Sequence, residues 1–258
     1  MIMALIAYAC FGMAPLNDDI IFWGVLSGII HGVYILCLSR AYSTADLSYV
    51  YPIARSAPIF VPVFAWLLLD EQLSISIFFA IVLILLAIFI LHFEGKVIQG
   101  FKNLIGAFGH QDLRWAFYTL AMVVSYSLVD KKGMDSFLNH LPDQPFANGI
   151  TYFFIEATIG FALCNVYVFA SHPAKYIFQT WRSEWKKAML AGTATLGSYG
   201  LICVVLQFEA LSAIVSLRQV SVLMVVYWGC WRLKEPFGPQ RLLAGVLILI
   251  GVILIGSP

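Results

Sequence analysis

The sequence predicts an all-α transmembrane protein, built as an inverted repeat of two five-helix halves. Three observations predict this fold class: an extreme composition, a series of apolar segments, and an internal repeat. Of the 258 residues, 61% are hydrophobic and 11% are charged, whereas soluble domains carry about 25% charged residues. We therefore expect the lipid bilayer to surround the protein. The net charge of +1, with no basic stripe, predicts no nucleic-acid partner.

Hydropathy divides the chain into nine apolar segments. Each is expected to be helical, because a backbone inside a bilayer must satisfy its own hydrogen bonds. The segments cover approximately residues 1–14, 20–38, 47–69, 74–92, 114–129, 147–170, 187–206, 210–231 and 242–256. The longest polar gaps between them are predicted to be loops, at residues 93–113, 130–146 and 171–186.

An internal repeat relates the third and fourth segments to the eighth and ninth. Residues 47–85 align without a gap with residues 211–249, and the matches include two polar pairs, Ser48 with Ser212 and Glu71 with Glu235. The copies are an odd number of spans apart, so they cross the membrane in opposite directions, as in many secondary transporters.

The repeat predicts one half at residues 1–93 and another at residues 112–257. The second half has five segments but the first has only four, and the segment at Met1 is short for a span. We therefore expect the first helix of a ten-helix fold to be missing, so that nine spans are present here.

Two arginines and a glutamate lie inside predicted spans, where ionisable side chains are costly and commonly functional. Arg55 and Arg218 enter from opposite faces to similar depths, so both are predicted near the midplane. Glu156 is the only acid well inside a predicted span. One carboxylate cannot neutralise two guanidiniums, which predicts an anionic or zwitterionic small-molecule substrate. A structural ion network is the alternative reading of these residues.

Several polar side chains accompany the arginines as candidate substrate contacts. Tyr51 precedes Arg55 by one helical turn, and Gln219 is adjacent to Arg218. His31 and Tyr34 lie within the second segment. A packed structural histidine is the alternative reading of His31.

Three prolines interrupt the span that carries Arg55. Pro52, Pro58 and Pro62 remove backbone donors and are expected to kink the helix. A kink together with a buried arginine predicts a helix that lines a polar cavity. The second copy lacks these prolines, so bending is expected mainly in the first.

Enzyme motifs are absent from the sequence. It contains no HExxH, no GxSxG, no phosphate-binding glycine loop and no cluster with metal-ligand spacing. We therefore predict no catalytic residues, no metal site and no cofactor.

Four stretches resemble the EamA-type transporters of the drug/metabolite transporter superfamily. They are "SRAYSTADLSYVYPIARSAP", "LVDKKG", "LSAIVSLRQVSVL" and "LKEPFGPQRLLAGVLILIGVILI". The resemblance extends over about residues 20–256 and implies ten helices in two inverted halves. The chain departs from the pattern at Ala45, usually Gly, and at Gln219, often Glu. The second departure removes a group that could exchange a proton beside Arg218.

The residues and the resemblance together predict a multi-pass transporter of the cytoplasmic (inner) membrane, as a monomer or homodimer. It would export a small organic metabolite or drug by alternating access between the two halves. The alternatives are a flippase of a lipid-linked sugar or phosphate, and a membrane scaffold that transports nothing.

Overall fold

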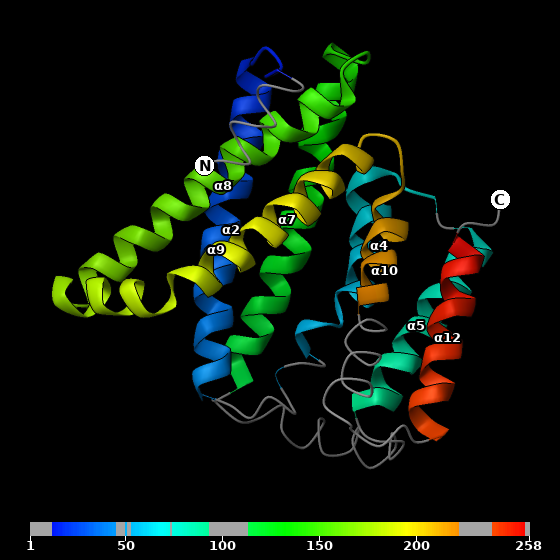
Figure 1. Cartoon of the computed structure of the whole chain (residues 1–258). Coiled ribbons are helices and arrows are strands. Elements are labelled where there is room, and N and C mark those ends of the chain that lie inside the picture. Colours follow the sequence, from blue (N-terminus) through cyan, green and yellow to red (C-terminus); the bar gives the residue numbers. More distant parts are fainter. Residues whose placement is uncertain are drawn as a thin grey trace. The chain divides into compact units, whose positions relative to one another are not determined.

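The computed structural model describes residues 12–44, 50, 53–72, 74–92, 113–221 and 239–255 (Figure 1). These residues form α-helices and contain no β-strand. The helices are α2 (Asp18–Thr44), α4 (Ala57–Leu69), α5 (Ile75–His92), α7 (Arg114–His140), α8 (Pro145–Ser171), α9 (Ala174–Val205), α10 (Leu211–Leu217) and α12 (Pro239–Ile255). A short 3₁₀-helix, η2 (Arg218–Val220), continues α10.

Three of these helices, α2, α8 and α9, are long and apolar enough to cross a membrane. At 1.5 Å per residue, the 27 residues of α2 and of α8 each reach about 40 Å. The predicted all-helical class is confirmed for the described residues, whereas the inverted repeat and the number of spans remain predictions.

Two predicted loops are largely helical in the structure. α7 continues through residues 130–140, and α9 begins at Ala174. The prediction failed because it followed the fall in hydropathy, and charged residues lower hydropathy without ending a helix. Here they form pairs along the helix, with Lys131 Nζ 2.8 Å from Asp135 Oδ1 and Lys187 Nζ 2.8 Å from Glu184 Oε2. Of the segment predicted at 1–14, only residues 12–14 are described, and they are not helical.

The span that was predicted at residues 47–69 is interrupted at Arg55 and Ser56. These residues form a turn, in which Ser56 N donates to Ile53 O at 3.1 Å, and α4 starts afterwards with Pro58 in its first turn. Pro62 lies inside α4. Pro52 and Tyr51 fall outside the described residues.

The proline-free copy also departs from α-helical geometry. α10 ends at Leu217, and Arg218 begins the 3₁₀-helix η2. The expectation that bending is concentrated in the proline-containing copy stays a prediction. A 3₁₀ stretch inside a helix is a common feature of functional hinges.

The chain forms two compact units, and each contains segments from both predicted halves. Unit 1 comprises Met1–Leu36 and Ser125–Glu209, and unit 2 comprises Cys37–Val124 and Ala210–Pro258. The units are defined by contacts and not by the repeat, so the halves at 1–93 and 112–257 stay a prediction.

Close packing in unit 1 brings α2 against α8 through glycines spaced four residues apart. A Cβ on Gly28 would lie 2.7 Å from both Glu156 O and Ile159 Cβ, and one on Gly24 would lie 2.9 Å from Ile155 Cγ2. Gly32 is similarly tight against Leu163. Small residues at this spacing allow helix backbones in membranes to approach closely.

In unit 2, α5 packs along α12 around the buried residues Ala87, Ala244 and Ile248 (Figure 1). Glu71, which follows α4, holds the start of α10. Its Oε2 accepts a hydrogen bond from Leu211 N at 2.9 Å, and its Oε1 accepts one from Ser212 N at 3.1 Å. A carboxylate is favourable there because the first amides of a helix lack partners within the helix.

The packing of α2 against α8 predicts the effect of a single added methyl group. Gly28→Ala should lower the free energy of unfolding by about 1–3 kcal/mol, because the added Cβ overlaps with the backbone of α8. Thermal unfolding of the purified protein in detergent measures the change. Gly192→Ala is the control, because a Cβ there meets nothing within 4 Å. Equal unfolding midpoints for the two variants would contradict the prediction.

Candidate functional site

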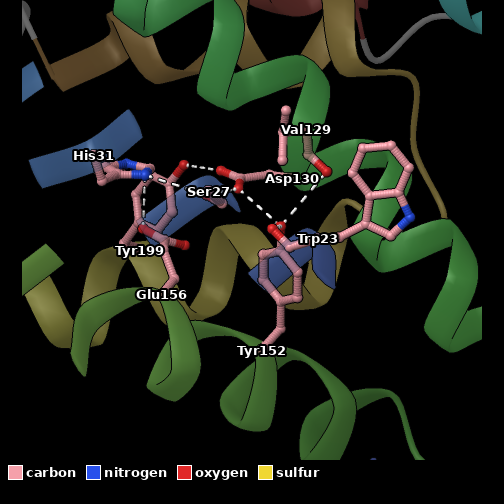
Figure 2. A network of polar contacts seen from close by, with 8 residues as sticks. All are labelled: Trp23, Ser27, His31, Val129, Asp130, Tyr152, Glu156 and Tyr199. Carbon is pink, nitrogen blue, oxygen red and sulfur yellow. Dashed lines mark hydrogen bonds and ion pairs between the residues drawn. The ribbon is translucent and has the colours of Figure 1, made fainter. Parts of the chain in front are cut away.

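A connected network of polar side chains lies inside unit 1 (Figure 2). Four helices contribute to it, with Ser27 and His31 from α2, Asp130 from α7, Tyr152 and Glu156 from α8, and Tyr199 from α9. The two residues from α2 are four positions apart, as are the two from α8. Side chains at this spacing share one helix face, so each helix presents both of its groups to the network.

Asp130 is the centre of the network, and its side chain has no exposed surface. Its Oδ1 accepts hydrogen bonds from Ser27 Oγ and from the Tyr152 hydroxyl, the latter at 3.2 Å. Its Oδ2 accepts one from the Tyr199 hydroxyl at 2.5 Å. Hydrogen bonds to a carboxylate are roughly twice as strong as those between neutral groups. The three donors therefore stabilise an ionised carboxylate here and tie α2, α8 and α9 to α7.

His31 connects the second carboxylate to this centre. Its Nδ1 lies 2.9 Å from Glu156 Oε1 and 3.4 Å from Ser27 Oγ (Figure 2). The Glu156 side chain is 3% exposed and that of His31 is 14% exposed. The imidazole ring stacks on Tyr126 at a centroid distance of 3.8 Å, and Tyr34 meets it edge-on at 6.2 Å.

Tyr152 owes its place to a glycine on the facing helix. A Cβ on Gly133 of α7 would lie 2.3 Å from Tyr152 Cε2, so only glycine leaves room for the fully buried ring. The Tyr152 hydroxyl also lies 3.4 Å from Trp23 O and 3.5 Å from Val129 O. One hydroxyl proton serves one main acceptor, and Asp130 is the nearest of the three.

The network has the chemistry of a cation site. His31, Asp130 and Glu156 each offer one ligating atom, and these atoms lie within 4.8 Å of one another. Carboxylates and imidazoles are groups that bind protons and metal ions in proteins.

The first part of the chain matches a known family. Residues 1–93 match the model of the EamA-like transporter family. This EamA-like domain includes α4, α5 and α2, which contributes Ser27 and His31 to the network. No curated protein matches the chain.

The EamA-like domain confirms the predicted resemblance over residues 1–93; the resemblance of the rest remains a prediction. The match over residues 1–93 and the three long apolar helices together indicate a multi-pass membrane protein. Members of the matched family are in general not enzymes but membrane transporters of small molecules.

The structure distributes the predicted site residues between the two units. Glu156, His31 and Tyr34 lie in unit 1 and belong to the network or border it. Arg55, Arg218 and Gln219 lie in unit 2, and Tyr51 is outside the described residues. Their roles in substrate binding remain predictions.

Asp130 is the functional candidate that sequence reasoning missed. The fifth apolar segment was predicted to end at residue 129, which placed Asp130 in a loop and left Glu156 as the only acid inside a span. In the structure α7 continues to His140 and buries Asp130, so Asp130 lies in a helix and not in a loop. Two signals were available: the helix-compatible "LVDKKGMDSF" after the segment, and the four-residue spacing of Ser27 and His31.

The hydrogen bond from the Tyr199 hydroxyl to Asp130 is predicted to contribute to the stability of the fold. Tyr199→Phe should lower the free energy of unfolding by about 1.5–3 kcal/mol, because it removes a hydrogen bond to a charged group. Thermal or denaturant unfolding in detergent measures it. Tyr176→Phe, at an exposed position on the same helix, should change little. A similar effect of both substitutions would argue against a strong bond to Asp130.

Proposed function

We propose that the protein exports a small organic metabolite or drug across the cytoplasmic membrane, by alternating access between two inverted halves. The observation that carries this proposal is the buried network around Asp130. Ionisable side chains inside apolar helices cost several kcal/mol and are typical of solute and ion pathways. Such residues are buried in a chain whose residues 1–93 match the EamA-like transporter family. This combination favours a transporter over a membrane scaffold that transports nothing.

Polar groups in unit 2 support a positively charged solute site there. Arg55 lies in the turn before α4, and Arg218 lies where α10 passes into η2. Irregular backbone at membrane depth is tolerated where it is covered by protein or lines a water-filled cavity. Each arginine is partly buried, and an arginine stays charged under all physiological conditions. These properties support our proposal that Arg55 and Arg218 bind an anionic group of the solute.

One face of α10 and η2 adds polar atoms that can receive a ligand. Ser212, Ser216 and Gln219 follow each other at helical spacing and are all buried. Among the described residues, Ser212 Oγ and Gln219 Oε1 have no hydrogen-bond partner. A buried polar atom without a partner costs about 1–3 kcal/mol, and a bound solute would remove this cost. Gln219 therefore stays in our proposal as a solute contact beside Arg218.

The central test compares small molecules released by cells that express the protein with those from cells that lack it. We expect a solute whose release depends on the protein. Asp130→Asn should slow this release by about tenfold or more, since the change leaves the rest of the buried network without its central charge. Asp135→Asn, an exposed acid on the same helix, is the matched control and should keep the original rate.

Each outcome of this profiling assigns a different function. Normal release by Asp130→Asn, at normal levels in the membrane, would contradict the role of the network. A lipid-linked sugar or phosphate that accumulates without the protein would identify a flippase. An unchanged solute profile would favour the scaffold.

The same assay tests the proposed solute site in unit 2. Arg55→Gln and Arg218→Gln should each slow release, and the corresponding Lys variants should slow it less, because lysine keeps the charge but loses the planar guanidinium fork. Arg182→Gln, at an exposed position of α9, is the control. If both Gln variants reach the membrane and release the solute at the original rate, the two arginines have a structural role.

A further inference from the structure

The helix α9 is longer than a membrane span requires, and its charged residues all lie in its first part. α9 has 32 residues, so at 1.5 Å per residue it reaches about 48 Å, whereas the hydrocarbon core of a bilayer is about 30 Å thick. Residues 188–205 contain no Asp, Glu, Lys or Arg and cover about 27 Å at the same rise. Residues 174–187 therefore extend beyond the hydrocarbon core.

One side of this first part is aromatic. Phe178, Trp181 and Trp185 follow each other at spacings of three and four residues, so they share a face of α9. The three residues are 69%, 58% and 45% exposed. Tryptophan is enriched at the boundary between the hydrocarbon and the lipid headgroups, because its ring is apolar and carries one polar N–H group. An aromatic row just beyond a span thus indicates contact with the bilayer surface.

A row of basic side chains runs beside the aromatic row. Lys175, Arg182 and Lys186 are exposed and are spaced by seven and four residues, so they also share a face of the helix. Lys186 Nζ lies 5.7 Å from the centroid of the Trp185 ring, which places this ammonium group next to the aromatic row. Helices that combine Trp and Phe on an apolar side with Lys and Arg on a polar side lie in the membrane interface.

The charge of residues 174–187 selects the kind of surface. The segment carries four basic side chains and a single acidic one, Glu184. Glu184 Oε2 lies 2.8 Å from Lys187 Nζ, and this pair lies off the basic row. Each Lys or Arg close to an anionic membrane surface strengthens binding about fivefold. The negatively charged headgroups of anionic lipids therefore complement the basic row, which zwitterionic headgroups do not.

We propose that residues 174–187 are a lipid-binding segment, which lies on the bilayer surface and binds the phosphate groups of anionic lipids. The aromatic row enters the interface, and the basic row contacts phosphate oxygens, which the Arg182 guanidinium can bind with two parallel hydrogen bonds. α8 ends at Ser171 and α9 begins at Ala174 (Figure 1). The lipid contact therefore also fixes the depth at which the chain turns from α8 into α9.

The test uses the full-length protein in lipid vesicles and the fluorescence of its own tryptophans. Phosphatidylcholine vesicles receive a small fraction of brominated phosphatidylglycerol or, in parallel, of brominated phosphatidylcholine, and both brominated lipids quench tryptophan on contact. The part of the quenching that is absent from the double variant Trp181→Phe/Trp185→Phe comes from the aromatic row. We expect this part to be about tenfold or more stronger with the anionic lipid, because several basic side chains contribute.

Variants of the basic row test its role directly. Arg182→Gln should lower the preference for the anionic lipid about fivefold, and the triple variant Lys175→Gln/Arg182→Gln/Lys186→Gln should abolish it. Lys187→Gln is the matched control, because it also removes one positive charge from the segment but belongs to the pair with Glu184. It should change the preference by less than about twofold. All four substituted positions are exposed, so the variants should keep the fold.

The salt dependence of the wild type tests the proposal without any variant of the basic row. Between about 0.05 M and 1 M NaCl the preference for the anionic lipid should fall, since the Debye length shortens to about 3 Å. No solute is added, so the result does not depend on the proposed transport function.

Four outcomes would overturn the proposal: equal quenching by the two lipids in the wild type, a preference that salt does not weaken, a preference that persists in the triple variant, or equal effects of Arg182→Gln and Lys187→Gln. Quenching by neither lipid, with a tryptophan signal that depends on protein density, would also overturn it. That last result would identify the aromatic row as a contact between copies of this chain.

Discussion

The burial of one carboxylate governs the arrangement of unit 1. Asp130 lies on α7 with no exposed surface, where an unsolvated charge is strongly unfavourable. Hydroxyl groups from α2, α8 and α9 replace the water that this carboxylate would otherwise bind. Each donor must hold its position, because the loss of one leaves the charge under-solvated. One acidic side chain thus fixes how four helices meet.

Glycines make this convergence possible. Gly24, Gly28 and Gly32 let α2 approach the backbone of α8, which brings His31 within 2.9 Å of Glu156. Gly133 leaves the space that the Tyr152 ring occupies. Charge and packing are therefore coupled: the polar contacts require short distances between helices, and only residues without a Cβ permit those distances. A substitution at one of these glycines should disturb the network without touching a polar atom.

The two units contain chemically different polar groups. Unit 1 holds a compact cluster of two carboxylates and an imidazole, joined by short contacts and stacked against the Tyr126 ring. Unit 2 holds Arg55 and Arg218 at backbone irregularities, with buried polar atoms of Ser212 and Gln219 that lack partners among the described residues. This difference is the basis for our proposal that an anionic solute group binds in unit 2.

The sequence by itself determined the class of this protein, because composition and apolar segments report directly on the surrounding solvent. It also provided the family resemblance, His31 and Glu156 as candidates, and the break in the helix near Pro58. It could not determine where α7 and α9 begin and end, since hydropathy measures solvent preference and not helix formation. Nor could it find Asp130, whose importance depends on three hydroxyls distant in the sequence. Only the tertiary structure brought those groups together, because the solvation of a buried charge is decided by contacts between helices.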